Sequence, residues 1–124
     1  MAYGPDKEGL LGRITNIQRD KRVILSVSEL RITSLPTLPS SLKELYCYNT
    51  PLTSLPDLPS GLKILACYNT QLTSLPDLPS GLESIDCSNT GLTSLPELPS
   101  GLQQLWCHTT PLISLPFLNT ILED

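Results

Sequence analysis

The segment LKILACYNTQLTSLPDLPSG, residues 62–81, carries the pattern that decides the fold of this chain. Near copies begin at Leu42, Leu82 and Leu102, at an unbroken interval of 20 residues, and residues 22–41 form a degenerate first copy. We number each unit from its first residue, so that leucine or isoleucine fills positions 1, 4, 11, 14 and 17 of the regular units and cysteine fills position 6. One unit cannot bury its apolar face alone, so this repeat predicts stacked coils with one continuous core.

The order of residues within the unit predicts the path of each coil. Positions 3 to 7 alternate outward and inward, as in ELYCY at 44–48, which indicates a strand. Prolines at positions 15 and 18 exclude a helix on the return path. The LPDLPSG segment is therefore expected to form an extended, polyproline-like back, with glycine easing the corner. Strands of successive coils should pair into a parallel sheet.

The unit LxxLxCxNTxLxxLPxLPxx resembles the short, 20-residue bacterial class of leucine-rich repeat over residues 22–121. The resemblance implies a right-handed solenoid with short parallel strands on a concave face, an extended convex face and little helix. Members of this class include secreted effectors of pathogenic bacteria, and many bind other proteins with the concave face. The resemblance thus implies a protein or peptide partner, and it leaves open secretion into a host cell.

The chain departs from this class at position 9 and at both ends. Asparagine is usual at position 9, but threonine stands there, and its hydroxyl donates one hydrogen bond where asparagine donates two, so we expect a turn ladder with fewer bonds. Residues 1–21 are too short for the helical cap of the effectors, and GRITNIQRDKRVILSV, 12–27, suggests an antiparallel hairpin turning at 19–21. Residues 122–124 are a tail. The threonines concerned are Thr50, Thr70, Thr90 and Thr110.

Charge and hydropathy exclude several classes of partner. Residues 1–41 hold six Lys/Arg and four Asp/Glu, a net of +2, whereas residues 42–124 hold two and eight, a net of −6. An acidic main body argues against nucleic acid, because binding the phosphate backbone needs clustered Lys and Arg. No run of about 18 apolar residues and no signal peptide occurs, so we expect no membrane span and a chain that is cytoplasmic as synthesised.

The repeated cysteines are predicted to be a packing ladder. Strands lie about 4.8 Å apart, and side chains in register keep roughly that separation, whereas a disulfide wants about 3.8 Å between its Cβ atoms. Four thiols in a line about 14 Å long cannot surround one zinc ion. We therefore expect reduced, buried cysteines, with no metal and no cofactor. These residues are Cys47, Cys67, Cys87 and Cys107.

Positions 3, 5 and 7 point outward on the sheet and form the candidate binding surface. Four of the six aromatic residues of the chain fall there. Exposed Tyr and Trp are typical of binding hot spots, although aromatic residues also simply suit strands. The surface covers about 400 Å², half of the roughly 800 Å² that each partner buries in a standard interface, which fits a peptide or a loop. The predicted partner-binding residues are Tyr46, Tyr48, Tyr68, Asp86, Trp106 and His108.

Other functions fit the sequence less well than binding. Ser88, His108 and Asp86 come together on the predicted sheet, but Asp86 should lie beside Ser88, and strand N–H groups are spent on the ladder, which leaves no oxyanion hole. We therefore expect no enzyme. Self-assembly through the concave face or an exposed terminal edge near FLNTILED, 117–124, is the alternative, and a repeat fragment of a larger effector is the third. An acidic row on the back, most simply a solvated surface, comprises Asp57, Asp77 and Glu97.

Overall fold

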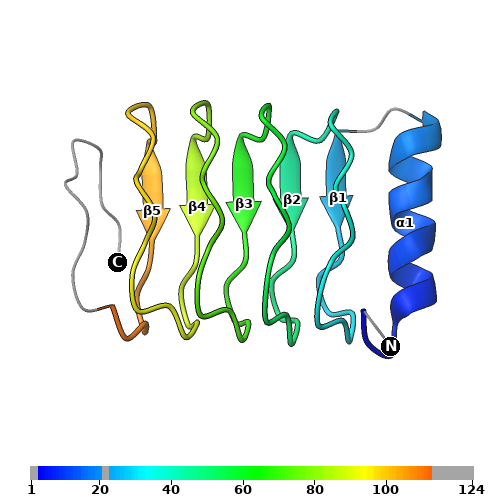
Figure 1. Cartoon of the computed structure of the whole chain (residues 1–124), viewed down its shortest axis with the longest axis horizontal. Coiled ribbons are helices and arrows are strands. Elements are labelled where there is room, and N and C mark those ends of the chain that lie inside the picture. The colour runs from blue at the N-terminus through cyan, green and yellow to red at the C-terminus, as the bar shows by residue number, and fades with distance from the viewer. Residues whose placement is uncertain (1–2, 21–22, 113–124) are drawn as a thin grey trace.

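A computed structural model describes residues 3–20 and 23–112 of the chain. Within these residues, one helix precedes five strands, which pair in parallel in chain order (Figure 1). Each strand belongs to one coil of the solenoid, and the return segments run along one face of the sheet (Figure 1). The predicted leucine-rich-repeat solenoid is thereby confirmed. The elements are α1 (Lys7–Asp20), β1 (Ile24–Ser26), β2 (Glu44–Tyr46), β3 (Ile64–Ala66), β4 (Ser84–Asp86) and β5 (Gln104–Trp106).

The coils stack with position against position. Leu45 of β2 pairs with Leu25 on one side and with Leu65 on the other, a shift of 20 residues at each step. The strands proper cover only positions 3 to 5, but the ladder continues beyond them. The Cys47 N–H donates to the Ala66 carbonyl at 2.8 Å, and the Asn49 N–H donates to the Tyr68 carbonyl at 3.1 Å. Backbone pairing therefore holds the coils in register through position 8.

The core is a stack of identical layers. Side chains at positions 1, 4, 6 and 11 are buried in coils 2 to 4, and leucines at positions 14 and 17 of these coils are half-buried against them. Because apolar burial is roughly proportional to area, each added coil extends the same core by the same increment. Among the described residues, no helix is both long and apolar enough to cross a bilayer.

The corner glycines have a different role from the one expected. The corner closes by a bond from the Leu62 N–H to the Pro59 carbonyl at 3.1 Å, and the same bond closes the corner that contains Ser41 in place of glycine. None of the corner glycines has a positive φ, so the corner does not need their conformational freedom. A Cβ at Gly61 would instead lie 2.8 Å from Lys43 Nζ. At Gly61, glycine leaves room for a lysine amine from the start of the same repeat unit.

The expected N-terminal hairpin is wrong, because residues 7–20 form α1. Leu10, Ile14 and Ile17 recur at helical spacing, and all three are buried. The helix lies beside β1 (Figure 1), and Arg13 Nη1 donates to the Ser26 carbonyl at 2.8 Å. An unpaired strand edge is a template for unwanted pairing, and α1 covers the first edge of this sheet. The C-terminal edge and the FLNTILED segment lie outside the described residues.

The segment before α1 ties the helix to the first coil. The Arg31 N–H donates to Asp6 Oδ2 at 2.6 Å, and the Arg31 guanidinium pairs with Asp6 Oδ1 at 3.0 Å. These bonds, the backbone one foremost, lower the pKa of Asp6. Gly4 has a φ of +99°, and a Cβ there would lie 2.8 Å from the Arg31 carbonyl, so this position requires glycine.

Candidate protein-binding face

The outward side chains at positions 3, 5 and 7 form one surface, which we call the strand face. The register places Tyr46, Asp86 and Trp106 in the row of position 5. Backbone bonds beyond the strands place Tyr48, Tyr68 and His108 in the row of position 7. His108 is exposed and the other five are half-buried. The structure therefore brings all six predicted partner-binding residues onto one face.

A stacked pair of tyrosines lies at the centre of the row of position 7. The rings of Tyr48 and Tyr68 are parallel to within 4°, with centroids 4.6 Å apart. In-register strands set equivalent side chains one inter-strand step apart, which is the separation that stacking needs. Burial is the first cause that raises the pKa of Tyr68, and the charges of Tyr48, Asp86 and Glu29 raise it further. Carboxylates of the first and fourth coils thus both act on Tyr68.

Tyr46 holds a carboxylate on the same face. Its hydroxyl donates to Glu44 Oε1 at 2.6 Å. This bond, with burial second, raises the pKa of Tyr46 to about 12. Both residues belong to β2 and point outward, so the bond fixes the Glu44 charge on the surface.

The Ser88, His108 and Asp86 group lacks the geometry of a catalytic triad. Ser88 Oγ lies 3.3 Å from His108 Nδ1, but Asp86 Oδ1 accepts the Ser88 backbone N–H at 3.1 Å. The N–H groups of Cys87 and Asn89 donate to carbonyls of the next coil. In this part of the chain no acid orients the histidine, and these strand N–H groups cannot form an oxyanion hole.

The threonines at position 9 bond within their own coil. Each hydroxyl donates to the carbonyl of the cysteine three residues earlier, at 2.8 Å for Thr50 and Thr110 and 2.9 Å for Thr70 and Thr90. Thr50, Thr70 and Thr90 are buried. They close the turn after the strand, and these bonds do not link one coil to the next.

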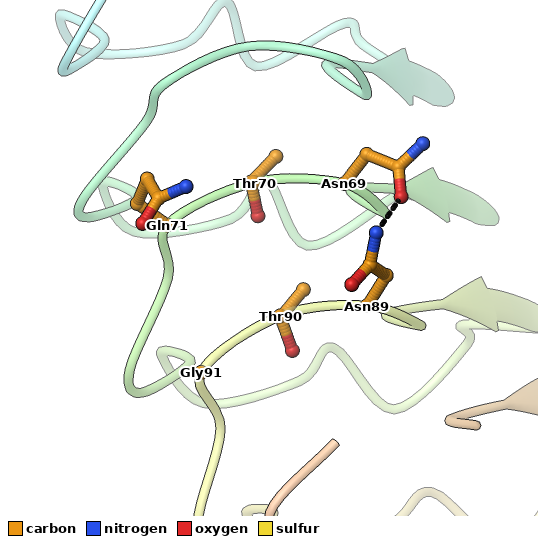
Figure 2. A pocket seen from close by; sticks show the side chains of 6 residues that line it. All are labelled: Asn69, Thr70, Gln71, Asn89, Thr90 and Gly91. Atoms are coloured by element: carbon orange, nitrogen blue, oxygen red, sulfur yellow. Dashed lines mark hydrogen bonds between the residues drawn. The ribbon is translucent and has the colours of Figure 1, made fainter. Parts of the chain in front are cut away.

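The coil-to-coil side-chain ladder lies one residue earlier, at position 8. Asn49 Nδ2 donates to Glu29 Oε2 at 3.0 Å, Asn69 Nδ2 donates to Asn49 Oδ1 at 2.7 Å, and Asn89 repeats the bond to Asn69 (Figure 2). The asparagines have φ of 54–55°, a left-handed conformation that Asn tolerates better than most residues. Sequence reasoning missed this ladder, although an asparagine repeated after a strand was the available signal.

An open groove of about 440 Å³ runs beside the asparagine ladder. Its polar groups are largely used between coils: the Gln71 N–H donates to the Leu52 carbonyl at 2.9 Å, and the Gly91 N–H donates to the Leu72 carbonyl at 2.8 Å. The groove is therefore a product of coil stacking. Its lining residues are Asn69, Thr70, Gln71, Asn89, Thr90 and Gly91 (Figure 2).

The four cysteines carry no disulfide. Cys47, Cys67 and Cys87 are fully buried, whereas Cys107 in the last described coil is only half-buried. Burial raises the pKa of Cys67 and raises that of Cys47 and Cys87 to about 12, which keeps these thiols protonated and unreactive. Within residues 3–20 and 23–112, no cluster of three His, Cys, Asp or Glu could hold a metal ion.

Comparison with known proteins places this solenoid beside bacterial effector domains. No family model and no curated protein matches the chain. Among solved structures, a Shigella effector LRR domain matches 96% of the chain at 30% identity with a TM-score of 0.92. YopM from Yersinia enterocolitica matches 96% at 30% identity with a TM-score of 0.79. The chain spans 56% of the first structure and 32% of the second. The protein has a leucine-rich-repeat fold, in general a protein-interaction scaffold, and it resembles the repeat domains of bacterial effectors.

Proposed function

We propose that this chain is a non-enzymatic binding module that captures a protein or peptide on the strand face. The observation that carries the proposal is the stacked pair of Tyr48 and Tyr68, 4.6 Å apart, on an outward surface that also holds Trp106. Tyrosine and tryptophan supply large contact area with few rotatable bonds, which is why they dominate binding hot spots. Stacking fixes these rings before a partner arrives and so reduces the ordering cost of binding.

The two faces of the solenoid support this choice of surface. The back repeats one proline-rich segment in the first four coils, whereas the strand face changes from coil to coil. A surface that distinguishes one partner from another needs different groups at different places. Of these two faces, the strand face has that variety.

The resemblance to effector domains extends the proposal to the setting of the protein. The partner would be a host-cell protein if the chain is delivered as effectors are, and the chain would act as the recognition part of a longer effector. Expression of the native gene in its source cell, followed by detection of the protein in the medium, tests delivery; retention inside the cell would contradict it.

Selection from a random peptide library displayed on phage, against the folded protein, tests the surface. We expect selected peptides to lose at least about tenfold in affinity, or 1.4 kcal/mol, when Tyr48, Tyr68 and Trp106 are all replaced by Ser. The matched control replaces three residues of the acidic back row, as Asp57→Asn, Asp77→Asn and Glu97→Gln, and should leave binding unchanged. Loss only in the control, or in neither variant, would move the site away from the strand face.

A further inference from the structure

The charge of the strand face indicates the chemistry of its partner. Rows 3, 5 and 7 of all five coils contain two carboxylates, Glu44 and Asp86, and no Lys or Arg. Glu29, at position 8 of the first coil, adds a third carboxylate beside the aromatic rows and acts electrostatically on Tyr68. The aromatic centre of the face is therefore set among negative charges.

Each of the three carboxylates is held in place through one oxygen. Glu44 Oε1 accepts from the Tyr46 hydroxyl, Asp86 Oδ1 accepts from the Ser88 N–H, and Glu29 Oε2 accepts from Asn49 Nδ2. These bonds leave the second oxygen of each group to meet a ligand. An anionic surface whose groups are already oriented loses little freedom when a cation binds.

The basic side chains near the strand face lie over corner residues or bond to a backbone carbonyl. Lys43 Nζ lies over the corner at Gly61, and Lys63 Nζ lies over the corner at Gly81, at the opposite end of the strands from the tyrosine pair. Arg13 donates to the Ser26 carbonyl at the α1 end of the sheet. The three carboxylates thus extend from the first coil to β4, and the amines of Lys43 and Lys63 lie at the corners that precede the strands.

We propose that the strand face recognises an arginine-bearing peptide segment, with guanidinium groups on the Tyr48–Tyr68 pair and its neighbouring carboxylates. This inference rests on the proposed function, because it names the partner of the same face. A guanidinium is planar, stacks on aromatic rings and pairs with carboxylates through two N–H groups, whereas a lysine ammonium is a point charge. Aromatic rings with flanking carboxylates therefore favour arginine over lysine.

Fluorescence anisotropy with three labelled peptides tests the proposal. The probe is GSRSRSRSG, and its matched controls carry lysine or uncharged citrulline at the three arginine positions. We expect the arginine peptide to bind at least about tenfold tighter than the citrulline peptide and about threefold tighter than the lysine peptide. Equal affinity for arginine and citrulline, or for arginine and lysine, would overturn the proposal.

A pair of charge variants separates the site from the overall acidity of the protein. Asp86→Asn removes one charge but keeps an oxygen for the Ser88 N–H, so the fold should be retained, as circular dichroism can verify. We expect it to weaken the arginine peptide about fivefold or more. Asp77→Asn removes the same charge from the back and should change affinity less than twofold. Equal losses in both variants would show bulk attraction and overturn the site.

The peptides selected from the random library distinguish this inference from the proposed function. Should a selected peptide require Tyr48 and Tyr68 while the arginine peptide shows no preference over citrulline, the strand face binds but its partner is not basic. Should neither kind of peptide respond to loss of the tyrosines, both proposals fail.

Discussion

Positions 7 and 8 of the repeat form adjacent rows that differ in nearly every respect. Position 8 is asparagine in three successive coils, and these side chains bond to one another across the coils. Position 7 reads Ser, Tyr, Tyr, Ser and His, and it varies from coil to coil. The asparagine row thus finds its partners in the neighbouring coils, whereas a varied row is shaped by demands outside the stack. The position 6 cysteines likewise form a repeated row.

Raising the pH should have the largest effect, because it removes the stability that the repeated cysteines at position 6 contribute. Cys47 and Cys87 have their pKa raised from 9.0 to about 12, so the stability they contribute is complete below pH 9 and is lost as pH rises toward 12. Each of these buried thiols should lower the free energy of unfolding by roughly 1.4 kcal/mol at pH 10, because the thiol ionises in the unfolded chain but stays protonated in the folded chain. Urea unfolding between pH 7.5 and 10 measures the fall.

Cys67→Ala provides the control for that prediction, because alanine does not titrate. The variant should be less stable at pH 7.5, where a small cavity is its main effect, yet lose less stability than the parent protein as pH rises. An identical pH dependence in both proteins would show that the buried thiols are not responsible.

Breaking the asparagine ladder should have the next largest effect. Asn69→Ala removes the bonds to Asn49 and Asn89 and places a less tolerant residue at a φ of 55°. We expect a loss of about 2–3 kcal/mol in the free energy of unfolding, measured with urea. Asn69→Gly removes the same bonds but suits the backbone, so it should cost about 1 kcal/mol less. Equal losses would leave no role for the backbone conformation.

Extending the ladder should give a smaller gain. Thr109 occupies position 8 in the last described coil at a φ of 57°, which is unfavourable for a β-branched residue. Thr109→Asn relieves the strain and offers an amide to Asn89, so we expect a gain of about 1 kcal/mol. Thr109→Ala is the comparison variant and should gain less than asparagine. A loss on asparagine substitution, read from thermal unfolding, would mean that the ladder does not extend to this coil.

Changing the strand face should affect stability least. Trp106→Thr exchanges one strand-compatible residue for another on an outward row, and we expect a change within about 0.5 kcal/mol. Chemical unfolding provides the measurement. A loss close to that of Asn69→Ala would make Trp106 a structural residue. Repeated and varied rows would then not differ in their contribution to stability.

Much of the fold, but less of the site, was predictable from sequence. The 20-residue period predicted the sheet, its register and the buried leucines, because apolar burial is non-directional and depends mainly on which positions repeat. The six residues of the candidate site were predicted to share a face, and they do. The stacking of Tyr48 on Tyr68 and the hydrogen bond from Tyr46 to Glu44 were not predicted, because both depend on side-chain orientations that the 20-residue period leaves open.

The N-terminal cap shows the limit most clearly. Leu10, Ile14 and Ile17 carry helical spacing, but β-branched residues and the adjoining RVILSV, 22–27, favoured strands locally. The segment is a helix because a helix covers the first strand edge. In this arrangement α1 buries these three side chains against the first coil, and Arg13 bonds to β1. Local propensity is a weak guide when tertiary contacts of this size compete with it.

The repeated core follows from the amino-acid pattern alone, since twenty-residue periodicity admits one way of aligning the leucines and cysteines. The same pattern also sets which residues face outward, because side chains in a strand alternate. Two features depend on contacts in the folded chain: asparagine at position 8, and not threonine at position 9, links the coils, and a helix ends the sheet. Hydrogen bonds depend on distance, direction and backbone φ, and these are settled only when neighbouring coils are in contact.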